Sequence, residues 1–90
     1  MKNALIGKAH GITTAIDKMN GHQRQRMPSV DFGEDYNRLR AATAKEFPDL
    51  EPLLPPPVKK SHDFDGTDST YAELRTFAEQ IYQMLATDDG

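Results

Sequence analysis

Residues 69–86 read STYAELRTFAEQIYQMLA, and this stretch decides the fold class. Thr70 and Glu73 match the capping box that begins many helices. The apolar side chains recur at helical spacing and fall within about 140° of arc around a helix. They are Tyr71, Leu74, Phe77, Ala78, Ile81, Met84 and Leu85. The pattern predicts an amphipathic helix over 69–86, in which Leu74, Ile81 and Leu85 should be the most buried residues.

Two further helical patterns lie upstream. Over residues 3–19 an apolar stripe covers about 120° of arc; it comprises Leu5, Ala9, Ile12, Ala15, Ile16 and Met19. Over residues 34–47 a narrower stripe comprises Tyr36, Leu39, Thr43 and Phe47. We expect Asn20-Gly21 to end the first helix and Pro48 to end the second. Ile16 and Leu39 should then pack on the helix over 69–86.

Two long connectors, 20–33 and 48–68, separate these patterns, and the second holds five of the six prolines. Leu50, Leu53 and Leu54 are expected to anchor its start on the core as a short helical turn. The scarcity of β-branched apolar residues disfavours a sheet. The sequence therefore predicts one all-α domain over 1–90, with three helices and a long proline-rich connector between the second and third. The alternative is a hairpin of the last two helices, with the first helix detached and used for dimerisation.

The composition excludes several classes of site. The chain has 90 residues, a net charge of -3 and no cysteine, so a disulfide scaffold and a thiolate metal site are both excluded. It has no phosphate-binding glycine loop, no nucleophile elbow and no pair of histidines one helical turn apart. We therefore predict a non-enzymatic protein with no catalytic residue, metal or cofactor. Asp63, Asp65 and Asp68 are interpreted as a polar turn before the last helix, and a weak cation site there is the alternative.

Charge and helix faces indicate an interaction protein. Residues 1–45 carry a net charge of +4 and residues 46–90 carry -7, so the halves can attract each other or an outside partner. Apolar residues at intervals of seven in the first helix suit a seam with another helix, and tyrosines edge the last helix. We predict a protein-binding regulator or adaptor whose partner is a protein of unknown identity or a second copy of the chain. The predicted interface comprises Leu5, Ile12, Met19, Tyr71 and Tyr82.

The alternative function is that of an accessory protein bound to nucleic acid. His22, Arg24 and Arg26 lie in one connector, and Arg38 and Arg40 follow in the next helix. Arginines contact phosphates and base edges. The acidic composition disfavours this alternative.

The apolar runs of the chain are short. None approaches the ~20 residues that cross a bilayer. The run Ala4-Leu5-Ile6 stops at Gly7, which is too short for the apolar part of a signal peptide. We therefore expect a cytoplasmic protein without a membrane partner.

Overall fold

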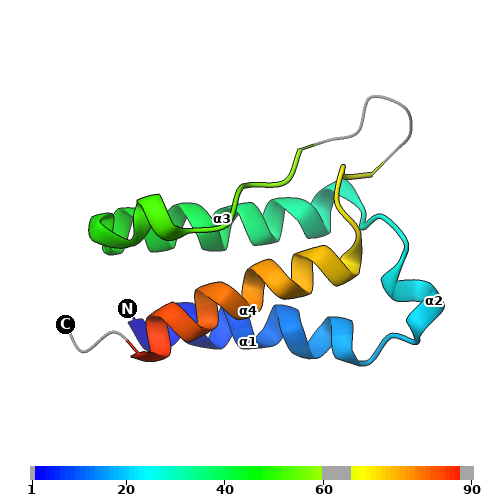
Figure 1. Ribbon diagram of the computed structural model, residues 1–90, viewed down its shortest axis with the longest axis horizontal. Coiled ribbons are helices and arrows are strands. Elements are labelled where there is room, and N and C mark those ends of the chain that lie inside the picture. The colour runs from blue at the N-terminus through cyan, green and yellow to red at the C-terminus, as the bar shows by residue number, and fades with distance from the viewer. Residues whose placement is uncertain (1, 60–65, 88–90) are drawn as a thin grey trace.

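The computed structural model describes residues 2–59 and 66–87, which form an all-α fold (Figure 1). Three long helices, α1 (Lys2–Asp17), α3 (Val30–Glu46) and α4 (Tyr71–Thr87), lie alongside one another. Two short helices connect them: α2 (Gly21–Arg24) and the 3-10 helix η1 (Pro48–Leu53). The all-α prediction is confirmed. The prediction of three helices is not, because the described residues form five and both connectors contribute one.

Local capping explains where these helices begin. Thr70 and Glu73 form the expected capping box before α4: the Thr70 N–H donates to Glu73 Oε1 (2.9 Å), and the Glu73 N–H donates to Thr70 Oγ1 (3.2 Å). A second capping box joins Asn20 and Gln23 and begins α2. Ser29 Oγ accepts a hydrogen bond from the Phe32 N–H, so α3 begins at Val30, four residues before the predicted start.

The core lies where α4 meets α1 and α3. Leu74, Ile81 and Leu85 are fully buried, as predicted, and Ile16 of α1 and Leu39 of α3 belong to the same apolar cluster. The packing of α1 on α4 is the most extensive between any two helices. The face of α1 that points away from α4 is exposed.

An ion pair joins the end of α1 to α4. Arg75 Nε lies 2.5 Å from Asp17 Oδ1, and both side chains are partly exposed. The hydrogen bond from Arg75 lowers the pKa of Asp17 below its ordinary value. Because the pair is accessible to water, its contribution to stability is small. This contribution to stability is fully present above the ordinary pKa of an aspartate. It is lost as the pH falls through the lowered pKa of Asp17.

Side chains of α3 hold the proline-rich connector by its backbone. Asn37 forms two hydrogen bonds of 2.9 Å with Val58, accepting from its N–H through Oδ1 and donating to its carbonyl through Nδ2. Tyr36 Oη donates to the carbonyl of Pro56 (2.9 Å), and Arg40 Nε donates to that of Pro55 (2.6 Å). Burial raises the pKa of Tyr36, so its hydroxyl remains a donor. The connector therefore runs back along α3 (Figure 1).

Apolar contacts supplement these hydrogen bonds. Leu54 and Val58 are buried in the core cluster, and Leu50 packs against it. Leu53 is 66% exposed, so the prediction that it anchors the connector is wrong. Leu53, the last residue of η1, points away from the core. Leu50 within η1 and Leu54 just after it point inward.

Gly33 lies inside α3, where Thr67 and Val58 of the connector lie close to the helix. A Cβ at this position would overlap Cγ2 of Thr67 and lie 3.1 Å from Cγ2 of Val58. We expect Gly33→Ala to lower the free energy of unfolding by about 1–3 kcal/mol through overpacking. Thr67→Ser removes the overlapping methyl group and keeps the hydroxyl that donates to Ser69. In urea denaturation the double variant should therefore recover most of the loss, and no recovery would contradict this explanation.

Candidate functional site

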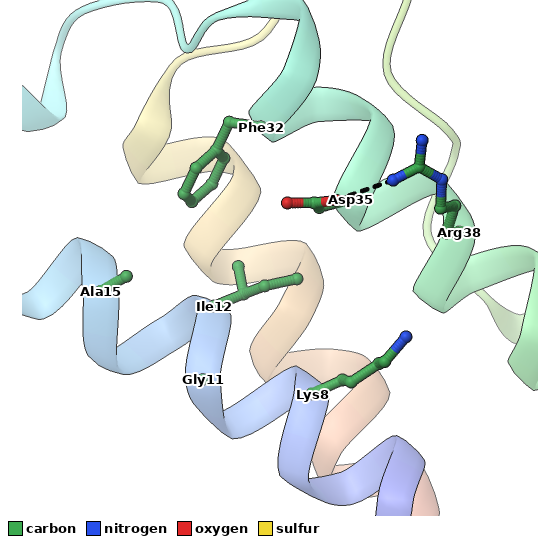
Figure 2. A pocket seen from close by; sticks show the side chains of 7 residues that line it. All are labelled: Lys8, Gly11, Ile12, Ala15, Phe32, Asp35 and Arg38. Carbon is green, nitrogen blue, oxygen red and sulfur yellow. Dashed lines mark hydrogen bonds and ion pairs between the residues drawn. The ribbon is translucent and has the colours of Figure 1, made fainter.

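A groove with a volume of about 390 Å³ lies between α1 and α3. Figure 2 shows α4 behind it and the two other helices on either side. The groove opens on the side of α1 that does not pack on α4. Its lining comprises Lys8, Gly11, Ile12, Ala15, Phe32, Asp35 and Arg38.

The groove has an apolar interior and charged edges. Ile12 and Phe32 are half-buried and pack against the core, whereas Gly11 and Ala15 are exposed and present little more than helix backbone. Phe32 and Ala15 lie at one end, and Lys8 lies toward the other (Figure 2). An apolar centre with a polar rim is the usual anatomy of a protein interface.

The charges at the edges differ in how they are paired. Arg38 contacts Asp35 at 3.0 Å and Glu34 at 3.6 Å along α3, and all three side chains are more than half exposed. Such exposed pairs add little stability. Within the described residues, the side chain of Lys8 on the α1 side forms no hydrogen bond or ion pair. The groove therefore offers a cation that a bound partner can pair.

A second hollow of about 290 Å³ lies beside the end of α1 and is lined by Met19, Gln23, Arg26, Met27 and Tyr71. The ring of Tyr71 meets that of Phe32 edge to face, with centroids 5.1 Å apart. Since Phe32 lines the groove and Tyr71 lines this hollow, the ring pair joins them. The second hollow is more polar than the groove, because Gln23 and Arg26 line it beside Met27, which is 40% exposed.

The residues of the predicted interface lie in three different places. Ile12 lines the groove, and Met19 and Tyr71 line the adjoining hollow. Leu5 is a core residue with 8% exposure. Tyr82 packs beside the ring of His10, with centroids 5.9 Å apart, on a different side of α1 from Lys8. The structure therefore places three of the five residues in two hollows that the Phe32–Tyr71 ring pair links.

Sequence reasoning missed the contribution of α3 to this surface. It assigned Phe32 to the connector 20–33, because the apolar stripe of the next helix was recognised only from residue 34 onward. The signal that could have corrected this is Ser29, a favoured N-cap residue just before Val30. Asp35, which the sequence did not single out as an interface residue, lies one turn inside α3 and lines the groove.

The basic residues of the alternative function are mostly engaged within the chain. Arg24 donates to the carbonyls of Asp17 (3.0 Å) and Ile16 (3.4 Å) at the end of α1. Arg40 donates to the connector and Arg38 pairs with neighbouring carboxylates. His22 and Arg26 are exposed.

The candidate cation site falls mainly outside the described residues, which exclude Asp63 and Asp65. Asp68 is described, and its Oδ1 accepts a hydrogen bond from the Lys59 N–H at 3.0 Å. The described residues include no cluster of three or more His, Cys, Asp or Glu side chains suited to a metal ion.

Comparison with family models, with curated proteins and with solved structures gives no match to this chain. No helix within residues 2–59 and 66–87 has both the length and the apolar character needed to cross a membrane. The groove between α1 and α3, with its adjoining hollow, is the surface from which a function can be inferred.

Proposed function

We propose that this protein is a non-enzymatic regulator or adaptor that binds a helix of a protein partner in the groove between α1 and α3. The observation that carries the proposal is an open, mainly apolar groove of about 390 Å³ between two helices. Grooves of this kind accept the apolar face of an amphipathic helix. The charged edges would then fix the direction in which the partner helix lies.

The half-buried side chains supply the driving force. Ile12 and Phe32 still expose part of their surface in the free protein, and fully burying a side chain of this size contributes about 1.5–3 kcal/mol. Gly11 and Ala15 let a partner backbone come close to α1. Nucleic-acid binding has less support, since Arg24, Arg38 and Arg40 already bond to other groups of the chain.

Photo-crosslinking in the cells that make the protein tests this proposal. Ala15→p-benzoylphenylalanine places a photoreactive ring in the groove, and Ala41→p-benzoylphenylalanine places it at an exposed position of α3 that does not line the groove. We expect a covalent protein adduct from position 15 and none from position 41. Adding Lys8→Glu, which reverses the free cation at the edge, should reduce the adduct by about tenfold or more.

The outcome that would contradict the proposal is equally specific. Equal adducts from both positions would indicate random collisions, and no adduct from position 15 would mean that the groove stays empty. Circular dichroism and thermal melting of each variant check that it is folded.

A further inference from the structure

We propose that the partner helix is α1 of a second copy of this chain, bound antiparallel about a two-fold axis near Gly11. This inference rests on the proposed function of the groove and names its occupant. Each copy would place its own α1 in the groove of the other, so that both grooves are filled at once. Such an isologous contact requires a surface that is complementary to itself.

The charges around the groove meet that requirement. Lys8 lies on the α1 side, while Asp31 and Asp35 lie one turn apart on α3. Neither Lys8 nor Asp31 forms an ion pair within the described residues. Ala4, Gly7, Lys8, Gly11 and Ala15 share one exposed face of α1, and Lys8 is the charged residue among them. The exposed carboxylate of α1, Asp17, lies on another side of the helix and pairs with Arg75. One side of the groove, on α1, is therefore basic, and the other side, on α3, carries the carboxylates of Asp31 and Asp35.

Two-fold symmetry brings these opposite charges together. In an antiparallel pair centred on Gly11, Lys8 of one copy lies opposite Thr14 of the other, three residues beyond the centre. Ala15 follows Thr14, and Figure 2 shows it at the same end of the groove as Phe32. Asp31 and Asp35 flank Phe32 in sequence, so the incoming lysine approaches an acidic edge. The same contact occurs a second time on the other side of the axis.

The glycines of α1 supply independent support. Gly7 and Gly11 lie inside the helix, where each costs about 1 kcal/mol relative to alanine. A Cβ at either position would meet no atom within 4 Å, so packing within the chain does not require glycine. A second helix crossing at Gly11 would use the space, because small residues allow two helix backbones to approach closely.

Analytical ultracentrifugation of the full chain at tens of micromolar tests the proposal. The 10.1 kDa chain should sediment as a species of about 20 kDa. Gly11→Leu should convert it to a folded monomer of about 10 kDa that keeps its helical circular dichroism, since a Cβ at residue 11 meets no atom of the free chain within 4 Å. Ala41→Leu, the matched control on α3, should remain dimeric. A wild-type monomer at this concentration would overturn the proposal, as would a Gly11→Leu dimer.

A charge exchange tests the geometry. Lys8→Glu and Asp31→Lys should each weaken self-association by about tenfold or more, because each homodimer then contains two like-charge contacts. An equimolar mixture should form a heterodimer as readily as the wild type, because every Lys8–Asp31 contact again joins opposite charges. A mixture no tighter than either variant alone would overturn the antiparallel arrangement.

These results separate this inference from the proposed function. A wild-type monomer whose position 15 is crosslinked to a different protein would overturn the dimer and leave the groove as a binding site. A wild-type monomer with no adduct at position 15 would overturn both.

Discussion

Replacing Ile81 with alanine is expected to lower the free energy of unfolding by about 2–5 kcal/mol. Ile81 is fully buried on α4, in the cluster that also contains Ile16 and Leu39. Truncation leaves a cavity where three helices meet, and the surrounding helices can close it only in part. A domain of this size has a total stability of about 5–13 kcal/mol, so the loss is a large fraction of the total and should lower the urea concentration at the midpoint of unfolding.

Urea denaturation followed by circular dichroism measures this effect. Leu74→Ala, at another fully buried position of α4, should behave in the same way. Gln80→Ala is the matched control, because residue 80 precedes Ile81 and is exposed. If both core variants unfolded at the same urea concentration as the wild type, the core would be assigned to the wrong face of α4.

The second large effect is expected from Asn37→Ala, which removes both hydrogen bonds that α3 makes with Val58. Val58 is 5% exposed, so its N–H and carbonyl would lose their partner in a nearly dry position. Each orphaned group costs about 1–3 kcal/mol, and the local loss should release the connector before the helices unfold.

Hydrogen exchange at the Val58 amide measures this release directly. The amide should exchange much faster in Asn37→Ala than in the wild type, while the amides of α4 change less. Asn3→Ala, an exposed asparagine of α1, is the control and should change neither. Unchanged protection of the Val58 amide in Asn37→Ala would show that other contacts hold the connector.

Local signals allowed the last helix to be predicted almost completely. Residues 69–86 carry a capping box and a wide apolar stripe, and α4 spans Tyr71–Thr87. Capping residues were missed where the helix that follows them is short or lacks a clear apolar stripe in its first turn. Asn20 was interpreted as part of a helix stop, whereas its side chain begins α2 in a capping box with Gln23. Residues 30–33 were assigned to the connector, whereas they form the start of α3, in which Gly33 lies against Thr67 and Val58.

The groove was predictable only in part, because it depends on how α1 and α3 lie relative to each other. The apolar spacing of α1 identified Ile12 and Met19 as surface candidates. It could not show that Leu5, at the same interval of seven, is covered by the core. Phe32 comes from another helix, and its contact with Tyr71 joins residues 39 positions apart in the sequence. Helical periodicity therefore identified candidate surface residues, but the packing of distant segments determines which of them line the groove.

The mass of the adduct formed by p-benzoylphenylalanine at position 15 tests the central claim, that the groove between α1 and α3 binds a helix of a protein partner. We predict a discrete covalent species of about 20 kDa, twice the mass of the 10.1 kDa chain, with the crosslink located in α1 of the second copy. A discrete adduct of another mass would replace the second copy with a different protein partner. The absence of any discrete adduct at position 15, in a variant that is folded, would contradict the claim.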